Sequence, residues 1–359
     1  MADRATDRIR PAVRGIAAYR VAIPPHRIKL NQNESPIELP AALKAEILER
    51  LRGIPWARYP EQQETALPAA LKASLALPEG IDVITGNGSN ELIQALLTAI
   101  LEPCASIVIP ASTFSLYRQF AAILGAKIVA VPLEADLAID PDRLAAAARD
   151  AGAQAIVFAR PNNPTGTAIP VDGVERLLAR TSSLVIVDEA YVEFARDSVV
   201  DLLGVHDRLI VLRTFSKALR CAGLRIGYMA AAAELVAEVR KVVPPFNTSI
   251  LDRETAAAIV RNLELLRPGI EATIAERDRM VGELDGIDGV APIPSEANFV
   301  CFRTDMPPRV VFDRLLERGI LVRDVSGYPL LSDFLRVSIG TPAENGAFLA
   351  ALREIMEDR

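Results

Sequence analysis

Polar residues that could do chemistry stand directly after three apolar runs of the chain. They are Asn163, the pair Asp188 and Tyr191, and Lys217, which follow residues 155–159, 184–187 and 209–213. Together they supply an amide, a carboxylate, a phenol and a primary amine. In open parallel sheets, ligands bind outside the carboxyl ends of the strands, so these three ends are predicted to meet at one site.

A fourth polar segment has the composition of a phosphate-binding turn. Residues 86–90 read Gly-Asn-Gly-Ser-Asn, follow an apolar run and precede a helix predicted to begin at Glu91. Small residues let a phosphate approach the backbone, and the first N–H groups of a helix attract an anion. Gly88, Ser89 and Asn90 are therefore predicted to hold a phosphate group.

One cofactor needs all of these groups. Pyridoxal 5′-phosphate carries an aldehyde that forms a Schiff base with an amine, a ring nitrogen that stays protonated beside a carboxylate, a ring hydroxyl and a phosphate. Lys217 offers the amine and Asp188 the carboxylate, while Asn163 and Tyr191 can hydrogen-bond the ring hydroxyl. The combination predicts a site for this cofactor, whereas each residue alone would be interpreted as a surface lysine, a helix cap or a turn residue.

The segments between these residues predict an α/β fold. Most of the strand candidates are continuous apolar runs, as expected when helices cover both faces of a parallel sheet. These candidates are residues 81–85, 106–109, 127–131, 155–159, 184–187 and 209–213, and helical patterns lie between them at 91–101, 116–124, 142–151 and 171–179. The alternation predicts a large domain with a mostly parallel sheet between helices.

The pattern changes after Pro244 and Pro245. Long helices are predicted over 252–284 with a break near Pro268, and a smaller α+β unit follows. Its predicted strands are residues 297–303, 320–322 and 334–339, and its helices are 309–318 and 344–357. We therefore predict four parts: an N-terminal arm at 1–45 that packs with the small domain, a large cofactor-binding α/β domain at 46–250, linking helices at 251–285, and a small α+β domain at 286–359.

Several motifs in order give the chain a specific resemblance. Asn-Pro-Thr-Gly at 163–166, Asp-Glu-Ala-Tyr at 188–191 and Ser-Lys-x7-Arg-x-Gly-Tyr at 216–228 are similar to the fold type I aminotransferases. Further motifs narrow the likeness, namely Leu-Asn-Gln-Asn-Glu-Ser-Pro at 30–36, Tyr-Pro at 59–60, the Gly-rich turn at 86–91 and Arg-x-x-x-Gly-Thr at 336–341. With them the chain resembles the histidinol-phosphate aminotransferase family over residues 11–341.

This resemblance implies catalytic roles. Lys217 would form the Schiff base and, once released by the substrate, would carry a proton between the substrate Cα and the cofactor. Asp188 and Tyr191 would be the other catalytic residues. Phe114 would stack on the pyridine ring, where a tyrosine is more familiar, so stacking is retained and a hydroxyl is lost.

The resemblance also implies how the cofactor phosphate is held. Ser216 and Arg225 would bind it from the same chain. Tyr59 would reach it from the partner subunit, which implies a homodimer with shared active sites.

For the substrate, the resemblance implies an anion site. Arg336 would bind the α-carboxylate of glutamate or the phosphate of a phosphorylated amino alcohol, and Arg323 would be a second anion contact. Tyr19 and Asn33 would also contact the substrate. The chain departs from the family at Arg220-Cys221, which occupies the turn after the lysine where glycine and a small apolar residue are usual.

Composition excludes several other classes of protein. The chain has 359 residues, of which 50% are hydrophobic and 24% charged, and its net charge is −6. Without a basic block, neither nucleic acid nor an anionic membrane is an expected partner. Two histidines make a metal site unexpected, and three widely spaced cysteines form no disulfide or zinc pattern, which favours a cytoplasmic location. No apolar run approaches the ~20 residues that span a bilayer.

The resemblance implies amino transfer between histidinol phosphate and 2-oxoglutarate in histidine biosynthesis. Aromatic amino acids are the near alternative substrates, and a threonine-phosphate-type decarboxylase on the same scaffold is a further one. A regulatory protein with an inactive domain is disfavoured because about ten residues before the first family-like segment cannot hold a DNA-binding extension. A nicotinamide dehydrogenase is disfavoured because the turn lacks Gly-x-Gly-x-x-Gly.

Overall fold

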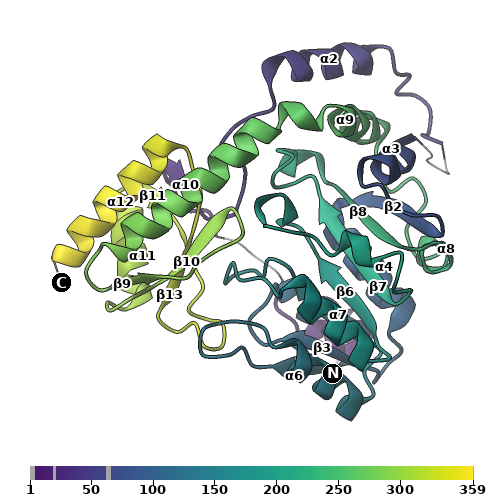
Figure 1. Cartoon of the computed structure of the whole chain (residues 1–359), viewed down its shortest axis with the longest axis horizontal. Helices are drawn as coiled ribbons and strands as arrows, with labels where there is room; N and C mark the ends of the chain where they lie inside the picture. Colours follow the sequence, from purple (N-terminus) through teal and green to yellow (C-terminus); the bar gives the residue numbers. More distant parts are fainter. Residues whose placement is uncertain (1–4, 19–21, 62–65, 359) are drawn as a thin grey trace.

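The computed structural model describes residues 5–18, 22–61 and 66–358. Its largest element is a seven-stranded sheet in the order β2-β8-β7-β6-β5-β3-β4 (Figure 1). The strands are β2 (Ile81–Asn87), β3 (Ser106–Pro110), β4 (Lys127–Val131), β5 (Ala155–Ala159), β6 (Leu184–Asp188), β7 (Leu209–Thr214) and β8 (Ile226–Ala232). β8 pairs antiparallel with β2 and β7, and the other neighbours are parallel.

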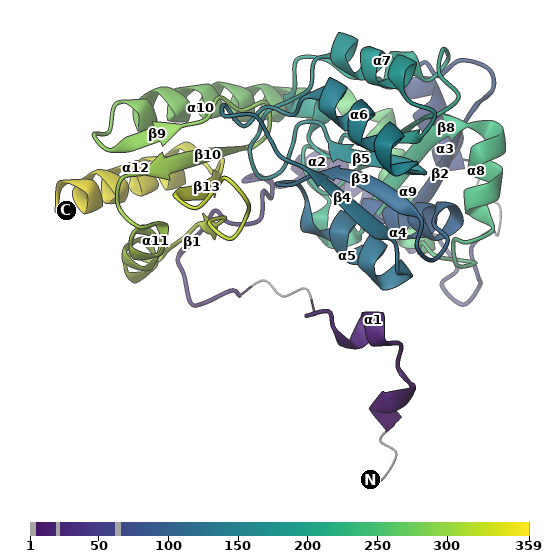
Figure 2. The same cartoon turned by 90° about the horizontal axis from the view of Figure 1, so that it is seen from below.

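Helices cover both faces of this sheet. One face carries α3 (Ala66–Ser74), α6 (Pro141–Ala151), α7 (Val171–Arg180) and α9 (Ile250–Arg261), and the other carries α4 (Gly88–Ile100), α5 (Ser115–Leu124) and α8 (Ala233–Arg240). Figure 2 shows α6 and α7 above the sheet and α4 and α5 below it. Because both faces are covered, all five residues of β5 are buried, which explains why that strand is a continuous apolar run.

A second sheet lies beside the first (Figure 1). It is antiparallel, in the order β12-β13-β10-β9, and its strands are β9 (Val290–Pro292), β10 (Phe299–Thr304), β12 (Arg323–Asp324) and β13 (Phe334–Ser338). α10 (Arg267–Asp285), α11 (Pro308–Glu317) and α12 (Pro342–Glu357) pack around a separate apolar core there. β1 (Ile28–Lys29) pairs with β11 (Ile320–Leu321), so this part of the N-terminal chain joins the second sheet's side of the molecule.

The remaining N-terminal helices are α1 (Pro11–Arg14) and α2 (Ala41–Arg52). Among the described residues, no helix is long and apolar enough to cross a membrane. The α/β fold class is confirmed, and each of the six strand candidates of the large sheet is a strand. The division into four parts at residues 45, 250 and 285 stays a prediction.

Several elements differ from the sequence-based expectation. β8 was not predicted, because its sequence Ile-Gly-Tyr-Met-Ala-Ala-Ala is mostly small residues with little β-branching. The helix expected at Glu91 begins three residues earlier, at Gly88, which places the phosphate-binding turn inside its first turn. The break near Pro268 falls at 262–266, because proline fits the first turn of α10, where its missing N–H is not needed.

Candidate active site

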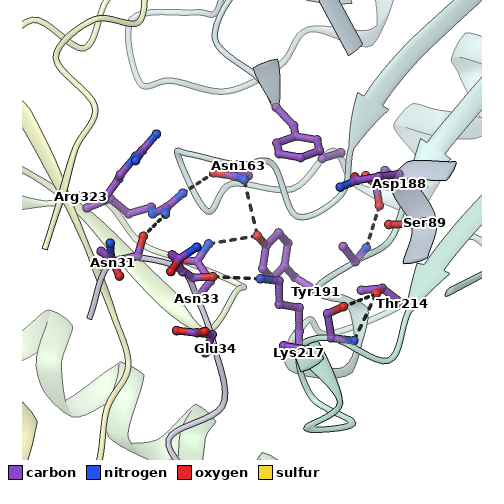
Figure 3. A pocket seen from close by; sticks show the side chains of 18 of the residues that line it. Asn31, Asn33, Glu34, Ser89, Asn163, Asp188, Tyr191, Thr214, Lys217 and Arg323 are labelled. Atoms are coloured by element: carbon purple, nitrogen blue, oxygen red, sulfur yellow. Dashed lines mark hydrogen bonds between the residues drawn. The ribbon is translucent and has the colours of Figure 1, made fainter. Parts of the chain in front are cut away.

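The four polar clusters meet in one cavity of about 370 Å³. It lies at the carboxyl ends of β5, β6 and β7, and the first turn of α4 closes one side. Figure 3 shows Asp188 and Ser89 on one side and Arg323 and Asn31 on the other, with Asn163 and Tyr191 between them. The predicted residues that line it are Asn33, Ser89, Asn90, Phe114, Asn163, Asp188, Tyr191, Ser216, Lys217, Arg225, Arg323 and Arg336.

Lys217 is the amine of the cavity. It stands three residues after β7, and its Nζ donates a hydrogen bond to the backbone oxygen of Gln32 over 3.0 Å. Burial, followed by the positive charges of Arg336 and Arg225, lowers the pKa of Lys217 to about 8. A large fraction of this amine is therefore neutral near pH 8, and a neutral amine is the form that attacks an aldehyde.

Asp188 is a buried carboxylate with two neutral hydrogen-bond donors. The phenol of Tyr117 donates to Oδ2 over 2.6 Å, and the backbone N–H of Ala190 donates to Oδ1 over 3.1 Å. Burial raises the pKa of Asp188 to about 6 despite these two bonds. A protonated ring nitrogen would supply the positive charge that a buried carboxylate requires.

The predicted phosphate-binding turn lies against Arg225. Gly88 has a φ of +74°, and a Cβ there would come within 2.5 Å of Nη2 of Arg225. A Cβ on Gly227 would come within 2.3 Å of the backbone nitrogen of Ser89. Both glycines are needed for this close approach, which places Arg225 against the N-terminal turn of α4. Arg225 also donates to Oγ of Ser216 over 3.2 Å. The guanidinium of Arg225, the hydroxyl of Ser216 and the first turn of α4 therefore lie at the same end of the cavity.

Tyr191 connects the two sides of the cavity. Its hydroxyl accepts hydrogen bonds from Nδ2 of Asn33 at 3.0 Å and from Nδ2 of Asn163 at 3.5 Å. Oδ1 of Asn163 in turn accepts from Nη1 of Arg336 at 2.5 Å. The phenol is thereby oriented by two amides, and one of those amides also fixes the arginine.

Two arginines line the end of the cavity opposite Asp188 (Figure 3). Arg323 in β12 and Arg336 in β13 are paired residues of neighbouring strands, and both line the cavity. Arg336 donates to the backbone oxygen of Asn31 over 2.9 Å and lies over the ring of Phe299, yet its buried Nε has no hydrogen-bond partner among the residues that the structure describes. Burial and the neighbouring charge of Arg323 lower the pKa of Arg336. Two guanidinium groups thus lie at one wall of the cavity, where their positive charge would favour an anion.

The other predicted residues fall in three different places. Phe114 lines the cavity at the start of α5, with its ring edge-to-face against Tyr117 at 5.5 Å. Tyr59 does not line the cavity of its own chain. It is 82% exposed and stacks on Phe246 with ring centroids 4.7 Å apart. Tyr19 lies outside the residues that the structure describes.

Comparison with known proteins identifies the family. The family model for aminotransferase class I and II matches residues 25–352. The chain belongs to the aminotransferase class I and II family. It is therefore a pyridoxal 5′-phosphate-dependent aminotransferase, and the resemblance drawn from the motifs is confirmed.

Relatives of this aminotransferase match it over nearly their full length. It is 42% identical over 347 residues to the histidinol-phosphate aminotransferase of Chlorobaculum parvum, covering 96% of this chain and 97% of that one. It is 38% identical over 357 residues to histidinol-phosphate aminotransferase 1 of Ralstonia nicotianae, covering 98% and 95%. The crystal structure of histidinol-phosphate aminotransferase from Sinorhizobium meliloti, in complex with pyridoxal-5′-phosphate, has a TM-score of 0.89 and 25% identity, with 98% of each chain covered.

The cavity of this aminotransferase fits the cofactor that its family requires. Gly88, Ser89, Ser216 and Arg225 would hold the phosphate, Asp188 the ring nitrogen, and Lys217 the aldehyde carbon. The fit rests on the cradle that a Cβ at Gly88 would fill, and on a buried carboxylate that has only neutral donors.

Residues that were missed from sequence complete the site. Tyr117, which hydrogen-bonds Asp188, lies three positions after Phe114, one helical turn along α5, and that spacing was a usable signal. Gln32 acts through its backbone oxygen, and Tyr328 lines the cavity from the loop before β13. The residue types of Gln32 and Tyr328 alone do not predict that they belong to the site.

Proposed function

We propose that this aminotransferase transfers the amino group between histidinol phosphate and 2-oxoglutarate, with glutamate and imidazole-acetol phosphate as the other two partners. The observation that carries the proposal is the arginine pair, because Arg323 and Arg336 offer one wall to a phosphate or to a carboxylate in turn. Relatives at about 40% identity that bear the name histidinol-phosphate aminotransferase support the same substrate.

In the proposed reaction, the chain holds the cofactor and moves one proton. Pyridoxal 5′-phosphate, when bound, supplies an electron sink for the carbanion at the substrate Cα. Lys217 would hold the cofactor through its amine, and its Nζ would take the Cα proton of the substrate. Asp188 would keep the ring nitrogen protonated, and Tyr117 and Ala190 hold that carboxylate in place.

The remaining side chains orient the two reactants. Tyr191 and Asn163 would hydrogen-bond the ring hydroxyl, and Phe114 would pack on the ring. Arg336 grips the carboxylate of glutamate or the phosphate of histidinol phosphate through paired hydrogen bonds, and Arg323 adds a second contact to the phosphate. Asn33 lies between Tyr191 and the substrate end, where we assign it a positioning contact to the substrate.

We also propose that the enzyme is a homodimer of the cytoplasm. Tyr59 and Trp56 are large side chains, 82% and 72% exposed, outside the cavity of their own chain. A second copy related by two-fold symmetry would cover them and bring Tyr59 to the neighbouring cofactor phosphate. The cytoplasmic location is supported by three free cysteines, of which Cys221 and Cys301 are buried.

Half-reaction spectra test the substrate assignment. The purified enzyme, loaded with cofactor, is mixed with glutamate, histidinol phosphate, phenylalanine or threonine phosphate, and the conversion of the cofactor is followed by its absorbance. Rapid conversion with glutamate and histidinol phosphate supports the proposal. Faster conversion with phenylalanine would make the enzyme an aromatic aminotransferase, and release of carbon dioxide from threonine phosphate would make it a decarboxylase.

A further inference from the structure

Arg220 occupies a backbone conformation that an arginine adopts only at a cost. Its φ is +60°, in the left-handed region that favours glycine. It lies in the turn after Lys217, where its N–H donates to the backbone oxygen of Lys217 over 3.0 Å. A costly conformation that persists beside a catalytic residue points to a role for its side chain.

The guanidinium of Arg220 joins three segments that are far apart in the sequence. Nη1 donates to the backbone oxygen of Glu38 over 2.9 Å, and Nη2 donates to the backbone oxygen of Leu266 over 3.3 Å. Leu266 immediately precedes α10, the long helix that leads to the second sheet. The side chain therefore ties the Lys217 turn to residues 31–38 and to the start of α10.

Gly269 leaves the space that this guanidinium fills. A Cβ at Gly269 would come within 1.8 Å of Nη2 of Arg220, which no side chain could tolerate without moving the arginine. Gly269 lies in the first turn of α10, where its own backbone is helical and would otherwise favour alanine. Arg220 and Gly269 therefore fit each other.

Residues 31–38 are the part of the chain that this contact restrains. Gln32 accepts the hydrogen bond of Lys217, and Asn33 donates to Tyr191. On the side of the second sheet, the backbone N–H of Asn33 donates to Oγ of Ser338 over 2.8 Å. The start of the segment is thus fixed at Asn31 by Arg336 and at Asn33 by Ser338 and Asn298, and its end is fixed at Glu38 by Arg220.

We infer that Arg220 is a positioning residue that clamps residues 31–38 against the Lys217 turn. Through this clamp, Gln32 and Asn33 stay in contact with Lys217 and Tyr191. The inference rests on the proposed role of Lys217, but the backbone restraint itself does not depend on which substrate the enzyme uses.

Hydrogen exchange of the cofactor-loaded enzyme tests the clamp. Arg220→Gly removes the guanidinium and also the unfavourable φ, while Gly269→Ala keeps the arginine but places a Cβ within 1.8 Å of its Nη2 and within 2.6 Å of Cδ1 of Ile37. For both variants we expect amide exchange in residues 31–39 to accelerate by about tenfold or more and kcat to fall by about the same factor, with exchange unchanged outside this segment, the Lys217 turn and the start of α10.

Two matched controls separate the clamp from other effects. Ala76→Gly relieves a φ of +49° at an exposed residue that does not line the cavity. Gly282→Ala adds a Cβ to α10 where, among the described residues, no atom outside the helix's own backbone lies within 4 Å. Both should exchange and turn over as the parent enzyme does. Unchanged exchange at 31–39 in both test variants would overturn the inference, as would acceleration spread evenly over the whole chain. Local acceleration with an unreactive parent enzyme would instead contradict the proposed function and leave the clamp standing.

Discussion

Replacing Asp188 with asparagine should stabilise the cofactor-free protein and damage the enzyme. In the protein as described, this carboxylate is 4% exposed and receives hydrogen bonds only from neutral groups. Its pKa rises from 3.8 to about 6, which corresponds to a cost of about 3 kcal/mol for holding the ionised form at neutral pH. Asparagine carries no charge and retains the bond from Ala190. It weakens the bond from Tyr117, so we expect a net gain of about 1–2 kcal/mol.

The stability gained by Asp188→Asn should depend on pH. A carboxyl group with a raised pKa binds more protons in the folded state than in the unfolded state, so stability falls as pH rises between 3.8 and about 6. The advantage of Asp188→Asn is therefore full above about pH 6 and disappears as pH falls to about 4. The midpoint of urea unfolding of cofactor-free protein, measured at pH 7.5 and pH 4.5, reports this difference.

Asp188→Asn should weaken cofactor binding and catalysis, although it stabilises the cofactor-free protein. Asparagine cannot hold the proton on the ring nitrogen, so cofactor affinity should weaken and turnover should fall by at least ~10²-fold. Glu193→Gln is a matched control, because burial raises the pKa of Glu193 to about 7 and this residue does not line the cavity. That variant should keep its cofactor affinity. An Asp188→Asn protein that is less stable than the parent at pH 7.5, or that turns over normally, would refute the reasoning.

Three further predictions concern the remaining roles. Lys217→Ala should lose turnover by at least about 10³-fold. Borohydride should fix the cofactor covalently to the parent enzyme but not to this variant. A fully active alanine variant would rule out the proposed role of the lysine. Arg336→Lys should cost both half-reactions about 2–4 kcal/mol in kcat/KM. Arg323→Ala should slow single turnover of histidinol phosphate more than that of glutamate. Equal slowing of the two substrates would contradict the role given to Arg323. The enzyme should sediment as a dimer at assay concentration, and Tyr59→Ala should weaken cofactor binding; a catalytically active monomer would contradict the shared site.

Residue types at strand ends were the part of the site that the sequence could reveal. Asn163 and Lys217 follow buried strands and Asp188 is the last residue of one, and the apolar run of each strand can be recognised in the sequence. Parallel pairing of the strands then brings those ends together, and the three side chains line the same cavity. Local pattern and chemistry agree at these positions, which is why the cofactor could be inferred before the fold was known.

Contacts between distant segments could not be inferred in the same way. Gln32 contributes a backbone oxygen, for which any residue type would serve, and β8 is held by its two neighbours although its sequence is rich in alanine and glycine. Arg220 was noticed only as a departure from a motif, because its partners Glu38 and Leu266 lie 182 and 46 residues away. These features depend on tertiary packing, which overrides local preference.

Transfer of labelled nitrogen tests the central claim most directly. The cofactor-loaded enzyme is incubated with imidazole-acetol phosphate and ¹⁵N-glutamate, and the products are analysed by mass spectrometry beside a parallel reaction with phenylpyruvate. We predict that ¹⁵N appears in histidinol phosphate, with kcat/KM for imidazole-acetol phosphate at least ~10²-fold above that for phenylpyruvate, because only the phosphate engages both Arg323 and Arg336. Unlabelled histidinol phosphate, or faster labelling of phenylalanine, would contradict the account.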